Sequence, residues 1–488
     1  MTRSTRVARN IITTFISQVV SWSLSFAVIL YLPHYAGAKG LGEITLAAAF
    51  ASVFGLVSSV GSSTVLMRDI PRDTPSAGRL ILASLIIRVP LAILSVGLGL
   101  IAGKALGYGS QMILLVGISL AGSIAGVISD TLSSAVRGLE TFSVANIGSV
   151  IDKVISSFII VLVCIDHGSI WLIVAAPLIS TSIASAYMFY AIRSFAIQWS
   201  MPDLAAIKSL AVAGLPFVSV GIFIAIYSKS DAIFLSKLST TESIGWYGLA
   251  TRIGGTAMAL PAAVCSAMLP ALSTLYREDR AAFVGGVARL INLMVLCSIP
   301  FSAAMIFCPD SLIAFVSHRT ASFLPAMNVV RIYGVAMILW FLSQAAFTGI
   351  IACNQQKRAA LSMGVAAVVS IPTTAGCIFF AEHFYHNGAI GAALSDVFIE
   401  VFLLSCYFFI LPKGAVSPSL LSITFRSLVA AAPLVAALYL LSLKLAIAVA
   451  FPCLAIYGIL CMQFKCLHVK DVQLFRQLIG GKFGLSKA

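Results

Sequence analysis

Residues 210–273 read LAVAGLPFVSVGIFIAIYSKSDAIFLSKL, then the turn STTE, then SIGWYGLATRIGGTAMALPAAVCSAMLPALS. Each half is apolar over more than the ~20 residues that a helix needs to cross a bilayer. Pro216 and Pro261 lie inside the two halves, and we expect each to kink its helix because proline removes a backbone hydrogen bond. The stretch therefore predicts a bent transmembrane hairpin.

Three charged residues interrupt this apolar hairpin, namely Lys229, Asp231 and Arg252. A charge near the bilayer centre costs roughly 2.5–3.5 kcal/mol on insertion scales. Lys229 and Asp231 are two positions apart, so they project from nearly opposite sides of one helix and cannot pair with each other. We expect Asp231 to pair with Arg252, which leaves Lys229 to face a cavity.

The composition of the whole chain agrees with a membrane protein. Of 488 residues, 60% are hydrophobic and only 10% are charged, with a mean hydropathy of +1.04. These values exclude a soluble globular domain. Ten cysteines are scattered without CxxC or zinc-ligand spacing, so we predict no metal site, and no motif predicts a cofactor.

The apolar segments predict an all-α polytopic protein with about 14 transmembrane helices. The expected spans are 11–32, 43–67, 80–102, 111–136, 147–165, 169–192, 210–237, 244–269, 282–308, 324–352, 359–381, 388–411, 423–443 and 445–463. With this count, 19 Lys and Arg residues fall in the termini and loops of one side and 5 in the loops of the other. The positive-inside rule then places both termini in the cytoplasm, explains the net charge of +14 without nucleic acid, and predicts a multi-pass cytoplasmic-membrane protein.

The chain also contains an internal echo. LGEITLA at 41–47 and IGWYGLA at 244–250 open the second and eighth expected spans, at an offset of 203 residues. If the match is meaningful, spans one to six and seven to twelve are two halves of parallel topology. Repeats of this kind recur in transporters, with the substrate site between them.

The hairpin, a polar connection at 193–209 and the order of the spans together resemble the polysaccharide flippases. These form the branch of the multidrug/oligosaccharidyl-lipid/polysaccharide exporter superfamily that moves lipid-linked oligosaccharides. The resemblance is carried by GLP at 214–216, Asp231, IGWYGLA at 244–250, LP at 260–261, LPALS at 269–273, LGE at 41–43, RGLE at 137–140 and GAIGAALSD at 388–396. The related lipid II flippases have an Arg-Asp pair in span one where this chain has Ser17 and Gln18, which argues against a peptidoglycan precursor as substrate.

The resemblance implies two six-helix lobes around a central cavity, and undecaprenyl-pyrophosphate-linked sugars as cargo. It divides the chain into a first lobe at 1–192, a cytoplasmic linker at 193–209, a second lobe at 210–411, two further helices at 412–463 and a cytoplasmic tail at 464–488. The expected function is a flippase that works by alternating access, in the bilayer, possessing no enzymatic activity, with polysaccharide polymerase machinery as a further partner.

Four basic residues lie deep in the expected spans and form a candidate cationic cavity: Arg88, Lys229, Arg252 and Arg331. Four such cations facing lipid would cost ~10 kcal/mol, so they must face protein or water. Arg and Lys suit a phosphate headgroup, and structural pairing with acids is the alternative. Asp396 and Glu400 are one turn apart in the same expected helix. Together with Asp231 they are candidates for coupling to H⁺ or Na⁺, against the alternative of pairing with cations.

Two other functions stay open on the sequence alone. A cation-coupled multidrug exporter shares the superfamily, but its cavity should be rich in acids, whereas this one is rich in bases. A membrane glycosyltransferase or polymerase normally needs a sizeable loop outside the membrane that carries catalytic carboxylates. The sequence contains no loop much longer than fifteen residues between the expected spans.

Overall fold

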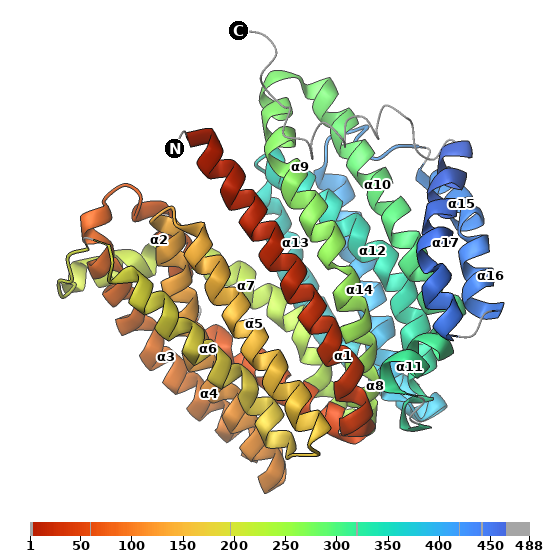
Figure 1. Cartoon of the computed structure of the whole chain (residues 1–488), viewed down its shortest axis with the longest axis horizontal. Coiled ribbons are helices and arrows are strands. Elements are labelled where there is room, and N and C mark those ends of the chain that lie inside the picture. Colours follow the sequence, from red (N-terminus) through yellow and green to blue (C-terminus); the bar gives the residue numbers. More distant parts are fainter. Residues whose placement is uncertain are drawn as a thin grey trace. The chain divides into compact units, whose positions relative to one another are not determined.

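Helices make up every regular element in the part of the chain that the structure describes (Figure 1). The structure is a computed structural model that describes residues 3–58, 60–195, 197–318, 321–418, 420–440 and 443–464. A helix satisfies its own backbone hydrogen bonds, which hydrocarbon cannot do, so an apolar chain of this composition folds in this way. Eleven helices in the described ranges are long and apolar enough to cross a membrane. The chain is therefore an all-α polytopic membrane protein, and the count of fourteen spans stays a prediction.

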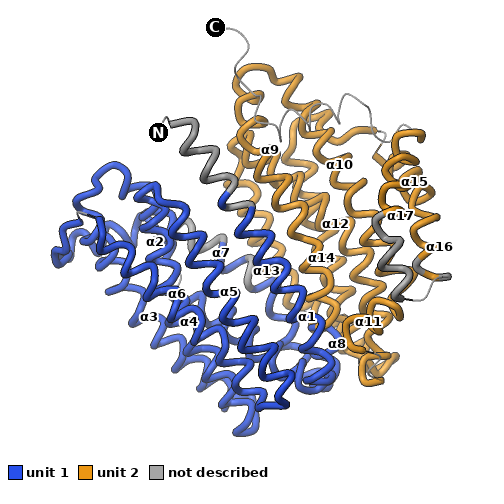
Figure 2. The backbone as a smooth tube through the Cα atoms, viewed as in Figure 1, with its two compact units in different colours: residues 1–248 blue, residues 249–488 orange. Residues whose placement is uncertain are grey.

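The first of two compact units is Met1–Gly248 (Figure 2). Its helices pack mainly as α4 on α6, α1 on α5, α5 on α6 and α3 on α4, while α7 contacts α1, α2 and α3. Their bounds are α1 Arg3–Gly55, α2 Ser62–Asp69, α3 Ala77–Ala105, α4 Ser110–Gly138, α5 Phe142–Ile165, α6 Ile170–Ile192 and α7 Leu204–Leu238, followed by α8 Thr241–Ala257, which continues into the second unit.

The second compact unit is Leu249–Ala488. Helices α10 and α12 have the largest buried share of the apolar helices in the described ranges and form the centre of this unit, with α13 packed on α14 and α14 on α12. The bounds are α9 Ala259–Glu278, α10 Arg280–Phe307, α11 Pro309–Ser317, α12 Ala326–Ala352, α13 Gln356–Tyr385, α14 Gly388–Ile410, α15 Leu420–Ala430, α16 Ala432–Leu440 and α17 Leu443–Gln463. The units divide at Gly248, so the lobe boundaries that the sequence suggested stay a prediction.

The expected span 43–67 is not one continuous helix. Helix α1 changes direction at Gly37, where φ is 63° and ψ is −175°, and it ends at Gly55. A short 3₁₀ turn, Leu56–Ser58, follows, and α2 begins after Gly61, which adopts the left-handed conformation at φ 64°. The hydropathy pattern did not predict this break, because apart from Glu43 the segment consists of apolar and small residues.

The interruption expected at Pro261 is present. Helix α8 ends at Ala257 and α9 begins at Ala259. Pro261 has no N–H to donate to the carbonyl of Ala257, so the α-helical ladder is broken at that point. At Pro216, in contrast, helix α7 runs through the position from Leu204 to Leu238, and the expected kink stays a prediction. Most of the 464–488 tail lies outside the described residues.

The echo at an offset of 203 residues has a counterpart in the packing of α1 on the start of α8, inside the first unit. A Cβ on Gly42 would lie 2.1 Å from the carbonyl oxygen of Thr241, and one on Gly245 would lie 1.9 Å from that of Ala38. These two close contacts are related by the offset itself, since 42 maps to 245 and 38 to 241. The repeated glycines therefore mark a reciprocal crossing of two backbones.

Candidate functional site

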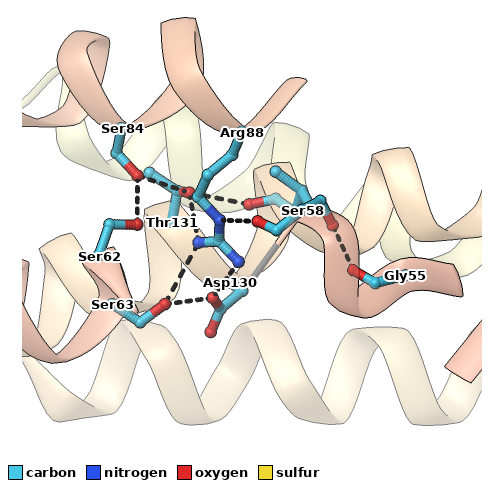
Figure 3. Close-up of polar contacts among 9 residues, drawn as sticks. Gly55, Ser58, Ser62, Ser63, Ser84, Arg88, Asp130 and Thr131 are labelled. Atoms are coloured by element: carbon cyan, nitrogen blue, oxygen red, sulfur yellow. Dashed lines mark hydrogen bonds and ion pairs between the residues drawn. The ribbon is translucent and has the colours of Figure 1, made fainter. Parts of the chain in front are cut away.

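Arg88 lies near the middle of α3 and is buried, with only 6% of the residue exposed. Its guanidinium donates through Nε to the carbonyl of Ser58 at 3.2 Å, and through Nη1 to Ser63 Oγ at 3.2 Å and Thr131 Oγ1 at 3.0 Å (Figure 3). Ser58 belongs to the turn that interrupts the expected second span, where carbonyls lose their helical partners. Arg88 thus satisfies a backbone break that hydrocarbon would not tolerate.

The fourth contact of Arg88 is an ion pair between Nη2 and Asp130 Oδ2 on α4, at 2.8 Å. The side chain of Asp130 is 49% exposed, whereas that of Arg88 is 7% exposed. Ser63 also donates to Asp130. The sequence reasoning missed Asp130, although an acid inside the apolar run 111–136 was a visible signal. The alternatives for Arg88 were a substrate-facing cation and structural pairing with an acid. This conformation shows the pairing, and Asp130 is the more exposed member of the pair.

A hydroxyl cluster extends this network away from Asp130. Ser62 Oγ and Ser84 Oγ are 2.8 Å apart, and Ser84 Oγ is 3.4 Å from Thr131 Oγ1. Thr131 also donates to the carbonyl of Val127 at 2.9 Å. The network joins α2, α3 and α4, so it fixes the depth and direction of the guanidinium (Figure 3).

Asp231 on α7 is 1% exposed and accepts a hydrogen bond of 2.9 Å from the hydroxyl of Tyr247. Lys229, two positions earlier, is exposed. The two side chains therefore differ in environment, as their spacing predicted. The expected pairing of Asp231 with Arg252 joins residues of different units and stays a prediction.

The other two predicted cations occupy different environments. Arg252 is half-buried on α8. Arg331 lies in the second turn of α12, where it is exposed and donates to Asn328 Oδ1 at 3.2 Å. Within the first unit, the structure brings Arg88 together with Asp130 but not with Lys229.

The two acids predicted on α14 both face α12. Tyr333 of α12 donates to Asp396 Oδ2, and the carboxyl of Glu400 lies beside Ser343 of α12. Glu400 is 7% exposed and Asp396 is half-buried. Their spacing of four residues does place them on one helix face, as expected. Hydroxyl neighbours of this kind accommodate either a charged or a protonated carboxyl.

Asp152 on α5 is a second acid that the sequence reasoning missed. Its Oδ1 accepts from Ser180 Oγ at 2.6 Å and from Thr181 Oγ1 at 2.9 Å, both on α6. The signal was an acid within the expected span 147–165. No group of three His, Cys, Asp or Glu side chains in the described ranges is placed to hold a metal ion.

A model of the family described as polysaccharide biosynthesis protein matches residues 7–276. No curated protein matches the chain in sequence. The fold is similar to that of the lipid II flippase MurJ in an inward closed conformation, with a TM-score of 0.70 and 14% identity over 95% of this chain and 99% of that one.

Two MATE transporters share the fold as well. An inward-facing multidrug resistance MATE family transporter of the MOP superfamily has a TM-score of 0.65 and 16% identity, over 80% of this chain and 94% of that one. A Vibrio cholerae MATE transporter has a TM-score of 0.55 and 13% identity, over 84% and 99%. At these identities the likeness concerns the fold alone. Because the family model covers more than half of the 488 residues, the chain belongs to the polysaccharide biosynthesis protein family.

Proposed function

We propose that this protein is a flippase that moves an undecaprenyl-pyrophosphate-linked oligosaccharide across the bacterial cytoplasmic membrane by alternating access. The match to the polysaccharide biosynthesis family carries the proposal. A membrane protein in such a pathway handles glycans attached to lipid, and the similar folds include a flippase and several transporters. Enzymatic catalysis is not part of the proposal.

The charged pyrophosphate is the part of the substrate that crosses the bilayer least readily without the protein. Moving an ion into hydrocarbon without partners costs tens of kcal/mol by Born estimates. Arg88 is held inside the first unit by hydroxyls and a carbonyl, and its acidic partner Asp130 is half exposed. In the proposed cycle, phosphate oxygens replace the Asp130 carboxylate at Nη2 of the guanidinium. The contacts of Arg88 to Ser58 and Thr131 stay in place.

Three further cations serve the same headgroup in this proposal. Lys229 is exposed and supplies a movable point charge, whereas Arg252 is half-buried and Arg331 is exposed near the start of α12. Their assignment as substrate-binding residues rests on charge and depth. The sugars then contact polar and aromatic side chains of the same path.

Asp396 and Glu400 are the proposed coupling residues in the second unit, with Asp231 as a further candidate in the first. Two carboxyls one turn apart in a helix interface resist simultaneous ionisation. One of them can therefore exchange H⁺ or hold Na⁺ as access alternates. Each carboxyl has a hydroxyl of α12 as a neighbour, Tyr333 for Asp396 and Ser343 for Glu400, so either one is a candidate for the exchanging group.

The proposed location is the cytoplasmic membrane, with both termini in the cytoplasm and polysaccharide polymerase machinery as a partner. The skewed loop charges support this orientation. Reporter fusions test it: fusions after Arg72, Lys208 and Lys357 should report the cytoplasm, and those after Lys104 and Glu382 the outside. Two adjacent loops reporting the same side would contradict the fourteen-span topology.

A cation-coupled multidrug exporter is the second candidate, because MATE transporters share the fold. The direct test uses the purified full chain in proteoliposomes with a fluorescent polyprenyl-pyrophosphate oligosaccharide in one arm and a cationic dye in the other. Translocation of the lipid-linked sugar without that of the dye supports the flippase. Translocation of the dye alone supports the exporter.

A further inference from the structure

An apolar groove of about 570 Å³ runs along the surface of the first unit between α3, α4 and α6. Small residues hollow it out, chiefly Ala121 and Ala125 of α4 and Ser182 and Ala186 of α6. Leu85 of α3 closes one side, and Phe189 lies at the end toward which α6 terminates. The groove contains no charged group, so a sugar or a pyrophosphate would find no partner in it.

The length of the groove corresponds to one leaflet. On α6 its residues run from Leu178 to Phe189, and on α4 from Ala121 to Leu132. Each run covers twelve residues, or about 16 Å from its first to its last Cα at 1.5 Å per residue. The hydrocarbon core of a bilayer is ~30 Å thick, so the groove matches about half of it.

A cation stands at the mouth of the groove. Arg193 caps α6 one turn beyond Phe189, and its guanidinium lies over the Phe189 ring, 4.7 Å from the ring centre. Trp199 packs against the same ring edge-on, at 6.1 Å between centroids. In the described ranges no carboxylate pairs with Arg193, which is exposed. An aromatic pair and a free cation at a helix end are typical of the level of lipid headgroups.

The groove is separate from the Arg88 network. Asp130 follows Ile128, a groove residue, by two positions, so it projects from the opposite side of α4. Neither Arg88 nor Asp130 is among the residues that line the groove. This separation favours a bilayer lipid over the isoprenoid chain of the transported substrate.

From this geometry we infer that the groove is a binding site for one anionic phospholipid. One acyl chain lies between α4 and α6, and the phosphate lies against Arg193. The loop charges predict that this end faces the cytoplasm, where anionic lipids concentrate. The inference does not depend on the proposed function.

The test measures lipid retained by the purified full chain, using native mass spectrometry with phosphatidylglycerol, phosphatidylcholine or a polyprenyl phosphate added in separate arms. We expect one phosphatidylglycerol to be retained by the wild type and lost in Ala186→Trp, which fills the groove. Ile183→Trp is the matched control, because Ile183 is exposed on the same helix and does not line the groove. Arg193→Gln should weaken retention about fivefold, and Arg193→Lys should restore most of it.

Photo-crosslinking gives a readout that does not depend on how the tryptophan variants fold. A phosphatidylglycerol with a photoreactive acyl chain should label peptides 121–132 and 178–189 of the wild-type protein. Equal retention by Ala186→Trp and Ile183→Trp, or labelling spread evenly over other helices, would overturn the inference. So would a preference for polyprenyl phosphate, which would make the groove part of the substrate path.

Discussion

The two units hold their intramembrane charges in different ways. In the first unit, Arg88 satisfies a broken helix and is neutralised by Asp130, so the charge is part of the architecture. In the second unit, Asp396 and Glu400 lie on a continuous helix and have hydroxyls of α12 as neighbours. We propose a division of labour in which Arg88 of the first unit contacts the anion and the two acids on α14 of the second unit exchange an ion.

The largest expected effect is that of Arg88→Ala. The substitution leaves the Ser58 carbonyl and two hydroxyls without their donor and Asp130 without its counter-ion, which we expect to lower stability by about 2–4 kcal/mol. Flipping should be lost as well. Thermal unfolding in detergent and flipping in proteoliposomes check both effects, and Lys104→Ala, an exposed cation at the end of the same helix, is the control.

The double variant Arg88→Ala with Asp130→Ala separates architecture from recognition. Removing both partners should recover part of the stability that either single variant loses, since no uncompensated charge remains. Flipping should stay low because the anion still lacks its guanidinium. A double variant that flips at the wild-type rate would show that the pair is structural only.

The next effect concerns the second unit. Asp396→Asn with Glu400→Gln should uncouple flipping from the ion gradient while glycan binding persists. Moving one charge through 100 mV yields ~2.3 kcal/mol, which favours one access state over the other by roughly fiftyfold. The double variant should lose this gradient-driven preference. Gradient-dependent flipping in vesicles measures it, and an unchanged response to the gradient would place coupling elsewhere.

A smaller effect tests whether close backbone packing supports both sites. A Cβ on Gly245 would lie 1.9 Å from the Ala38 carbonyl oxygen in the first unit, and one on Gly391 would lie 2.2 Å from that of Cys377 in the second. Each Gly→Ala substitution should cost about 1–3 kcal/mol, because backbone must shift. Gly255→Ala is the control, since nothing lies within 4 Å of its Cβ. Thermal unfolding of the three variants measures the cost of each substitution. Equal stability of all three would contradict close backbone packing at Gly245 and Gly391.

The smallest effect contrasts two ion pairs of α3. Arg79, unlike Arg88, is at the exposed end of the helix and pairs with Asp203, which also accepts from the N–H of Ala206 at 3.1 Å. These contacts lower the pKa of Asp203, with the Arg79 hydrogen bond as the main cause. A lowered carboxyl pKa means that the stabilisation is complete above the ordinary value and is lost as pH falls through the lowered one. Acid titration of wild type and Asp203→Asn should therefore diverge only slightly, at neutral pH, and converge in acid.

Much of the fold could be predicted because transmembrane helices are dictated locally. Apolar length gave the class and most of the helices, and Pro261 gave the interruption between α8 and α9. The break at 56–61 could not be predicted, since it depends on a left-handed Gly61 and on Arg88, a donor supplied by another helix. Local sequence does not report such a tertiary partner.

The candidate site was predicted in part. Depth and charge selected Arg88, Asp396 and Glu400 as candidates, and their roles stay predictions. The spacing of Lys229 and Asp231 placed them on opposite sides of one helix, and Lys229 is exposed whereas Asp231 is buried. The partners were missed: Asp130 for Arg88, and the α6 hydroxyls for Asp152. Pairing across helices depends on their rotation about their axes, which a hydropathy pattern as uniform as this one does not determine.

The central claim is that an anion carried on a lipid is moved past Arg88. The most direct measurement is flipping of a polyprenyl-pyrophosphate oligosaccharide by wild type, Arg88→Lys and Arg88→Ala in proteoliposomes, with stability monitored in the same preparations. We predict that wild type flips the substrate, Arg88→Lys flips it slowly because it keeps the charge but not the bidentate donors, and Arg88→Ala does not flip it. Wild-type flipping by a folded Arg88→Ala protein would contradict the claim.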